Sequence, residues 1–166
     1  LFPYTTLFRS LIEKGELGSS VSASSDGPWD PILIVAPIIL LENEVWTGDM
    51  RSFFDGDGAI FRPWLILHGN TVKSFRRPDL AGQETKLGEP VLDLARLREY
   101  RVILTNYDTL TNYQHSFARM RDHLTVVVTD EAQEHKTPNT KISHALKALS
   151  PRFRIASTGT PVENRL

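Results

Sequence analysis

The sequence predicts an α/β fold in which a parallel sheet carries helices on both faces. Short apolar segments rich in β-branched residues recur along the chain, as in strands that are buried on both faces of a parallel sheet. Segments with a helical spacing of apolar residues separate them, and this alternation favours parallel strands joined by helical crossovers. The chain has 166 residues, which is the size of one domain, and its 40% apolar content is usual for a globular protein.

The composition narrows the classes of function. The net charge is −1, so binding to nucleic acid would depend on a local groove and not on a general basic surface. The absence of cysteine excludes disulfides and thiolate zinc sites, and it suits a reducing compartment. No apolar run approaches the roughly 20 residues of a membrane span, and no basic and apolar leader opens the chain. We therefore expect a soluble cytoplasmic protein with no membrane partner.

Three regions follow from the local sequence. Residues 1–10 have neither a helical nor a strand period, and we expect them to be a non-native tail outside the fold. Residues 11–30 combine the end of a helix, stopped at Gly18, with a serine-rich flexible linker. Residues 31–166 carry the alternating pattern and are expected to form the folded part.

The first half of this region contains two predicted strands, at 32–35 and 64–68. Between them lies a helix whose apolar side chains have the spacing i, i+4, i+7 and i+8: Trp46, Met50, Phe53 and Phe54. The turn at 55–58, Asp-Gly-Asp-Gly, should break that helix. Residues 69–90 are polar and are expected to form a long exposed connection before a short charged helix at 92–98.

The second half contains three more predicted strands, at 102–104, 126–128 and 153–157, with a weak helix at 110–121. Residues 137–140, Thr-Pro-Asn-Thr, supply a helix start with capping side chains. The apolar stripe of the following helix is Ile142, Ala145, Leu146 and Leu149. Burial of each large member of this stripe is worth roughly 1.5–3 kcal/mol, so the stripe should face the sheet.

Two carboxylates, Asp130 and Glu131, follow the strand at 126–128 directly. Ligands of open α/β sheets bind at the carboxyl ends of the strands. One carboxylate there could hold Mg²⁺ on the phosphates of a nucleotide, while its neighbour orients or deprotonates an attacking water. Acidic residues also suit the first turn of a helix, so the pair alone leaves both interpretations open.

Four segments together carry a more specific signal. They are Pro31-Ile32-Leu33-Ile34-Val35-Ala36-Pro37, Val102 to Leu110, Val126 to Gln133 with its Asp-Glu-Ala-Gln, and Arg154 to Asn164 with its Thr-Gly-Thr-Pro-Val-Glu-Asn. In this order they resemble motifs Ia, Ib, II and III of superfamily-2 helicases. The last two are most similar to those of the Swi/Snf branch of double-stranded-DNA translocases, in a bacterial member. The resemblance covers about residues 11–166 and implies a RecA-like lobe of the P-loop NTPase class at 31–166.

The resemblance implies the chemistry of individual positions. Asp130 would hold Mg²⁺, and Glu131 would be the catalytic carboxylate that acts on water. Gln133 would join the network that senses the state of bound ATP. Motif III would couple the ATP site to DNA through three residues: Thr158, Gly159 and Thr160. Gly159 allows the tight backbone turn, although turn chemistry alone would also account for the two hydroxyls.

The resemblance also implies a path for double-stranded DNA. Pro37 and Asn43 in motif Ia, and Thr105 and Asp108 in motif Ib, would lie along it. Backbone amides and short polar side chains bind phosphate without a large positive charge, which agrees with the net charge of −1. Ordinary loops between strands and helices would have similar sequences. Trp46 departs from the family, whose motif Ia tryptophan follows the position of Asn43 closely.

One motif of the family is absent from the sequence. No Gly-Lys-Thr or Gly-Lys-Ser occurs, so the phosphate-binding loop and its lysine are missing. We therefore expect a RecA-like lobe truncated at both ends, inactive alone, whose parent also contains a second RecA-like lobe. Loss of the strand that leads into the phosphate loop should uncover the strands at 32–35 and 126–128.

The favoured function is thus part of the ATP-hydrolysing motor of a DNA translocase or helicase-like remodelling ATPase associated with the nucleoid. The alternative is a DNA-binding or scaffolding domain with a degenerate ATPase, which the intact Asp130 and Glu131 pair argues against. A dinucleotide-binding oxidoreductase would need Gly-x-Gly-x-x-Gly after the first strand. Gly56-x-Gly58 is followed by Phe61 instead, so this class fails.

Overall fold

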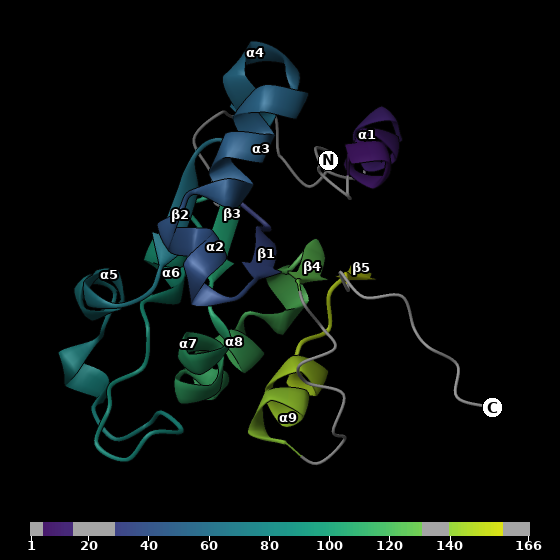
Figure 1. Cartoon of the computed structure of the whole chain (residues 1–166). Coiled ribbons are helices and arrows are strands. Elements are labelled where there is room, and N and C mark those ends of the chain that lie inside the picture. Colours follow the sequence, from purple (N-terminus) through teal and green to yellow (C-terminus); the bar gives the residue numbers. More distant parts are fainter. Residues whose placement is uncertain (1–4, 15–28, 131–139, 158–166) are drawn as a thin grey trace.

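A computed structural model describes residues 5–14, 29–130 and 140–157 and contains one five-stranded sheet between two layers of helices (Figure 1). The strands are β1 (Ile32–Val35), β2 (Trp64–Leu67), β3 (Val102–Thr105), β4 (Val126–Thr129) and β5 (Phe153–Ala156). The main helices are α1 (Thr5–Glu13), α2 (Ile38–Glu42), α3 (Val45–Phe53), α5 (Asn70–Ser74), α6 (Leu94–Leu97), α7 (Tyr107–Asn112), α8 (Gln114–Arg119) and α9 (Lys141–Ala148). Single turns form α4 (Asp55–Gly58), η1 (Ala59–Phe61), η2 (Pro78–Leu80) and η3 (Arg121–His123). All five predicted strands are confirmed, each shifted at most at its last residue.

The strands lie in the order β2-β3-β1-β4-β5, and every neighbouring pair is parallel. β1 is central: its Ile32 lies opposite Val102 of β3 on one side and Val126 of β4 on the other. The predicted parallel α/β fold is therefore confirmed. Because the strands are parallel, their carboxyl ends all lie at the same edge of the sheet.

Alternation along the strands divides the apolar side chains into two cores. In β1, Leu33 and Val35 enter the first core, on the face covered by α5, α6, α7, α8 and α9. Ile32 and Ile34 enter the second core, on the face covered by α1, α2 and α3. Successive side chains of a strand point to opposite faces, so a strand covered on both sides must be apolar throughout.

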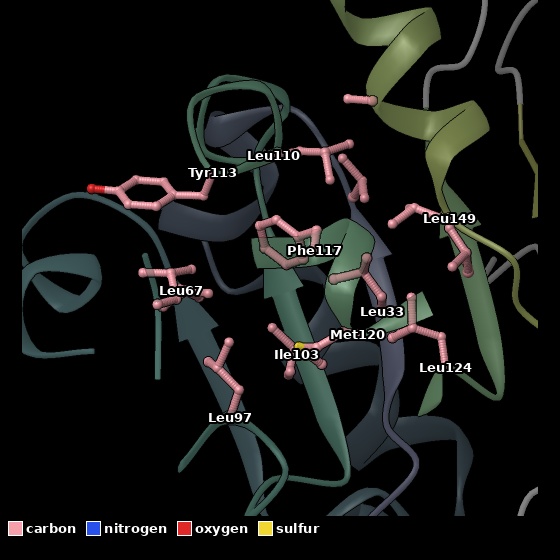
Figure 2. Close-up of a cluster of buried hydrophobic side chains, with 14 of the residues drawn as sticks. Leu33, Leu67, Leu97, Ile103, Leu110, Tyr113, Phe117, Met120, Leu124 and Leu149 are labelled. Atoms are coloured by element: carbon pink, nitrogen blue, oxygen red, sulfur yellow. The ribbon is translucent and has the colours of Figure 1, made fainter. Parts of the chain in front are cut away.

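The first core is filled by side chains that converge on the sheet from its helices (Figure 2). Phe117 of α8 and Leu110 of α7 are at most 1% exposed. The predicted stripe on α9 is confirmed, since Ala145 and Leu149 are buried and Ile142 and Leu146 pack against this core. The N-cap of α9 is Thr140, whose Oγ1 accepts a hydrogen bond from the backbone N–H of Ser143 at 3.2 Å.

The second core includes a helix that the sequence did not predict. Residues 5–13 form α1, and Phe8 is completely buried against the rings of Phe54 and Phe61 in edge-to-face contacts. The prediction that residues 1–10 have no helical structure is therefore wrong for residues 5–10. Residues 1–4 and 15–28, which include most of the predicted linker, lie outside the described residues.

The prediction for α3 and for its end is confirmed in part. Trp46 and Met50 are buried as predicted, but Phe53 is 37% exposed and lies outside the core. The predicted break at 55–58 is confirmed, because Gly56, Asp57 and Gly58 have positive φ angles between 56° and 70°. Gly58 is required for a second reason: a Cβ there would lie 2.8 Å from the backbone oxygen of Met50.

The connection between β2 and α6 is more structured than the predicted exposed loop. It contains α5, and Glu84 within it is only 5% exposed. The Glu84 carboxylate accepts hydrogen bonds at the start of α8, from the His115 backbone N–H at 2.7 Å and from the Ser116 hydroxyl at 2.6 Å. The connection is thus tied to the first core through one buried carboxylate.

Glu84→Ala is expected to lower the free energy of unfolding by about 1.5–3 kcal/mol, because it removes a charged acceptor from buried donors. Urea denaturation of the chain measures this change. The exposed Glu99 provides the matched control, and Glu99→Ala should change the stability by no more than about 0.5 kcal/mol. Equal effects of the two substitutions would contradict a structural role for Glu84.

The sheet is also covered where bare faces were expected. Ile32–Val35 and Val126–Val128 are at most 4% exposed, so the prediction that these strands lose their cover is wrong. Within the described residues, the open edge next to β4 belongs to β5, whose Arg154 and Ala156 are exposed. Among the described residues, no helix has the length and apolar character that a membrane span needs.

Candidate functional site

The carboxyl edge of the sheet brings the four motif segments together. Backbone hydrogen bonds continue past the ends of the strands and connect these segments side by side. The donors and acceptors are Ala36 N to Thr105 O at 3.0 Å, Asp130 N to Val35 O at 2.8 Å, and Ser157 N to Thr129 O at 2.8 Å. Segments separated by up to about 120 residues of sequence therefore form one continuous edge.

Asp130 lies half-buried in the middle of this edge, and three elements hold it. Its backbone N–H donates to Val35 at the end of β1. The indole Nε1 of Trp46 in α3 donates to its carboxylate Oδ2 at 3.1 Å. The hydroxyl of Tyr107 in α7 donates to its backbone carbonyl at 2.7 Å. Both the position of the residue and the direction of its carboxylate are therefore fixed by neighbouring elements.

Local sequence explains how the two aromatic donors reach Asp130. Glu44 adopts a left-handed conformation with φ of 52°, and this turn separates α2 from α3 and directs Trp46 toward the sheet. Asn106 caps α7, where its side-chain oxygen accepts from the Thr109 N–H at 2.9 Å. The cap fixes the first turn of α7, which begins at Tyr107. Trp46 is 3% exposed and Tyr107 is 7% exposed.

The structure describes only some of the predicted site residues. Asp130 and the predicted DNA contacts lie within the described residues. The remaining predicted residues lie outside them: Glu131, Gln133, Thr158, Gly159 and Thr160. The roles of these five residues stay predictions. Their neighbours Asp130 and Ser157 directly follow the adjacent strands β4 and β5, and Ser157 N–H donates to the Thr129 carbonyl.

The predicted motif Ia contacts lie at the two ends of α2. Pro37 precedes the helix and is half-buried, whereas Asn43 follows the helix and is exposed. Pro37 lies next to the carboxyl edge, because α2 begins three residues after β1 ends. Asn43 therefore presents its amide to solvent, as a phosphate contact would require.

The predicted motif Ib contacts differ from one another. Thr105 is completely buried, and its hydroxyl donates to the Leu67 carbonyl at 2.8 Å inside the sheet. Asp108 is exposed in the first turn of α7, where a carboxylate favours the helix N-terminus but repels a phosphate. Their participation in DNA binding stays a prediction. In this arrangement Thr105 would act through the shape of the turn and not through its hydroxyl.

Sequence reasoning missed two residues of the site. Trp46 was assigned to the apolar face of a helix and compared with the motif Ia tryptophan of the family, and Tyr107 was assigned no role of its own. A signal was present, because buried tryptophan and tyrosine side chains usually need a partner for their polar atom. The sequence does not indicate which partner that is, since the two donors lie 84 and 23 residues away from Asp130.

Comparison with known families decides the class of the protein. The profile of the SNF2-related domain matches residues 6–166, which is nearly the whole chain. The chain belongs to the SNF2-related family. The resemblance to the Swi/Snf branch, which rested on the last two motifs, is thereby confirmed. The family match begins at residue 6 and includes α1 from that residue onward.

Relatives and solved structures of the SNF2-related family agree with this assignment. The Zorya protein ZorD of Escherichia coli is 39% identical over 139 residues, 82% of this chain and 12% of its own length. The DNA repair and recombination protein RDH54 of Saccharomyces cerevisiae is 27% identical over 97% of this chain and 16% of its own length. The chain therefore spans less than a fifth of these relatives.

One similar solved structure is the Sulfolobus solfataricus SWI2/SNF2 ATPase core in complex with double-stranded DNA. It is 27% identical, with a TM-score of 0.57, and the match covers 96% of this chain and 25% of that one. The five-stranded parallel sheet is accordingly the RecA-like fold of such ATPase cores, as the sequence predicted.

The side chains present at the edge fit a magnesium ion. Mg²⁺ bound to a nucleotide is usually held by one or two carboxylates together with phosphate oxygens and water. Asp130 offers a carboxylate at the carboxyl edge, and Trp46 donates to one of its two oxygens, Oδ2. No Gly-Lys-Thr or Gly-Lys-Ser occurs in the sequence, and the role of Asp130 in holding the ion stays a prediction.

Proposed function

We propose that this SNF2-related chain is part of the ATP-hydrolysing motor of a double-stranded-DNA translocase. The main support is the position of Asp130, which lies at the carboxyl edge beside the end of β1 and accepts a hydrogen bond from Tyr107 in the segment that follows β3. A carboxylate that binds Mg²⁺ would thereby lie next to the two segments proposed to contact DNA. The match to an ATPase core in complex with double-stranded DNA supports the same function.

Within this function each motif residue has a chemical role. Asp130 would hold Mg²⁺, which neutralises charge on the transferred phosphate. Glu131 would orient the attacking water, and Gln133 would sense the bound nucleotide. An arginine from a second RecA-like lobe of the parent would complete the site. Catalysis of this type depends on several positioned charges acting together, so the isolated chain should not hydrolyse ATP.

The proposed DNA path runs along the exposed ends of the motif Ia and Ib segments. Asn43 is exposed after α2, and the turn from Thr105 to Asp108 follows β3. Such contacts fix the position of a duplex but do not read its sequence. A protein that moves along DNA needs contacts of this kind, so we propose that it works on duplex DNA in the nucleoid.

Duplex DNA is expected to stimulate ATP hydrolysis by the full-length protein, and Thr158→Ala with Thr160→Ala should remove most of that stimulation. The two hydroxyls follow β5 and are proposed to connect the nucleotide site with the DNA path. Steady-state ATPase assays with and without duplex DNA measure both effects. The exposed Thr85 provides a control, and Thr85→Ala should keep full stimulation.

Three outcomes separate the possibilities. Full DNA stimulation in the double variant would leave the two threonines with a turn-forming role only. DNA binding by the full-length protein without any ATP hydrolysis would favour the scaffolding alternative. The absence of both activities would contradict the proposed function.

A further inference from the structure

Asp130 is held by one aromatic donor from each face of the sheet. Trp46 belongs to the second core, on the face of α1, α2 and α3. Tyr107 belongs to the first core, on the opposite face. The first donates to the carboxylate and the second to the backbone carbonyl of the same residue, at 3.1 Å and 2.7 Å. A displacement of the helices on either face therefore reaches Asp130 through one of these hydrogen bonds.

Each donor lies in a segment that is proposed to contact DNA. Trp46 follows Asn43 by three residues, and the left-handed turn at Glu44 lies between them. Tyr107 lies between Thr105 and Asp108, in the first turn of α7. A DNA phosphate bound at either segment would shift the helix that carries the donor, which is α3 for Trp46 and α7 for Tyr107.

The burial of the Trp46 and Tyr107 rings would transmit a shift of α3 or α7 to Asp130. Both rings are buried, at 3% and 7% exposure, so they move with the helices that carry them. Hydrogen bonds weaken steeply when their distance or angle changes. A small shift of α3 would therefore change the direction of the Oδ2 atom, and a small shift of α7 would move the backbone at Asp130.

We propose that Trp46 and Tyr107 are positioning residues through which bound DNA sets the orientation of the Asp130 carboxylate. This inference rests on the proposed function, because it assumes that Asp130 holds Mg²⁺ and that motifs Ia and Ib bind DNA. It adds a route by which bound DNA would control ATP hydrolysis, through the orientation of the carboxylate that holds Mg²⁺. This route is separate from the motif III threonines.

The variants Trp46→Phe and Tyr107→Phe each remove one donor and keep an aromatic ring in the core. In the full-length protein, each is expected to lower DNA-stimulated turnover by about tenfold, the order that one hydrogen bond supplies. DNA affinity should be retained. Trp46→Phe should also raise the Mg²⁺ concentration needed for half-maximal turnover, because its donor contacts the carboxylate itself.

A second measurement does not depend on catalysis. The full-length protein is labelled with 5-fluorotryptophan, and the ¹⁹F resonance of Trp46 is identified by its loss in Trp46→Phe. Duplex DNA, added without nucleotide, is expected to shift this resonance, because the ring fluorine reports on the surroundings of the indole and these change when its contact with Asp130 changes. Fluorescence anisotropy of labelled DNA confirms that the duplex is bound under the same conditions.

Two matched control variants remove an indole N–H and a tyrosine hydroxyl at positions that do not contact Asp130. Trp64→Phe deletes an indole N–H in β2, where the ring packs below Arg51 and Arg62, and Tyr100→Phe deletes a hydroxyl beside Phe75. Both controls should keep DNA stimulation within about twofold of the wild type. A decrease in the controls equal to that in Trp46→Phe and Tyr107→Phe would show a general packing effect and overturn the proposal.

The outcomes for the two hypotheses are distinct. Full stimulation in both site variants, with an unmoved Trp46 resonance in a protein that binds DNA and hydrolyses ATP, would overturn the positioning roles and leave the proposed function intact. A wild-type protein without DNA-stimulated hydrolysis would overturn the proposed function and this inference together.

Discussion

Glu131→Gln in the full-length protein is expected to lower DNA-stimulated ATP turnover by about 10²–10⁴-fold, the usual cost of losing a positioned general base. Glu131 follows Asp130 in the sequence, and Asp130 lies directly after β4, at the carboxyl edge where parallel sheets bind their ligands. The amide keeps the size of the side chain but cannot accept a proton from water. Binding of ATP and Mg²⁺ should therefore be retained while turnover falls.

Steady-state ATPase assays with saturating duplex DNA measure the change in turnover, and equilibrium binding of a fluorescent ATP analogue measures nucleotide affinity. Glu99→Gln makes the same chemical change at an exposed position after α6 and should behave like the wild type. If Glu131→Gln kept near-wild-type turnover, the assignment of the catalytic carboxylate would be wrong. A loss of ATP binding would instead indicate that Glu131 holds the nucleotide.

Phe117→Ala is expected to destabilise the chain by about 3–5 kcal/mol, which is the usual cost of removing a large buried ring. Phe117 is 1% exposed and lies within the first core, between α8 and the sheet (Figure 2). A total stability of about 5–15 kcal/mol is usual for a domain, so this one substitution removes a large share of it. Urea denaturation followed by circular dichroism provides the measurement.

Phe53→Ala is the matched control, because Phe53 is 37% exposed at the end of α3 and lies outside both cores. We expect the free energy of unfolding to change by less than about 1 kcal/mol in that variant. Similar effects of the two substitutions would contradict the division between the buried ring and the exposed one. Unfolding of the wild-type chain without a cooperative transition would contradict the two packed cores themselves.

The strands were predictable because a strand buried on both faces has a local signature. Val126–Val128 and Ile32–Val35 are runs of branched apolar residues, and a parallel sheet with two helical layers requires such runs. The stripe on α9 was predictable for a similar reason, since the spacing of Ala145 and Leu149 places both on one face. In both cases the decisive information lies within a few residues.

The connection at 69–90 shows where such local reasoning fails. Its polar composition indicates an exposed loop, yet Glu84 is buried because it meets the unpaired backbone donors at the start of α8. The partners lie about 30 residues further along the chain, so no local pattern marks them. The helix α1 was missed for the same reason, since Phe8 is buried by Phe54 and Phe61, which are distant in sequence.

The sequence by itself determined the α/β class, the positions of the strands and the identity of the motif residues at their ends. These depend on the periodicity of apolar side chains and on short motifs, which are local properties. Only the tertiary structure decided the order of the strands and the partners of Asp130. The indole of Trp46 and the hydroxyl of Tyr107 reach this residue because parallel pairing brings the ends of β1, β3 and β4 to one edge. Hydrogen bonds between distant segments follow from that pairing, and the spacing of residues along the chain does not encode them.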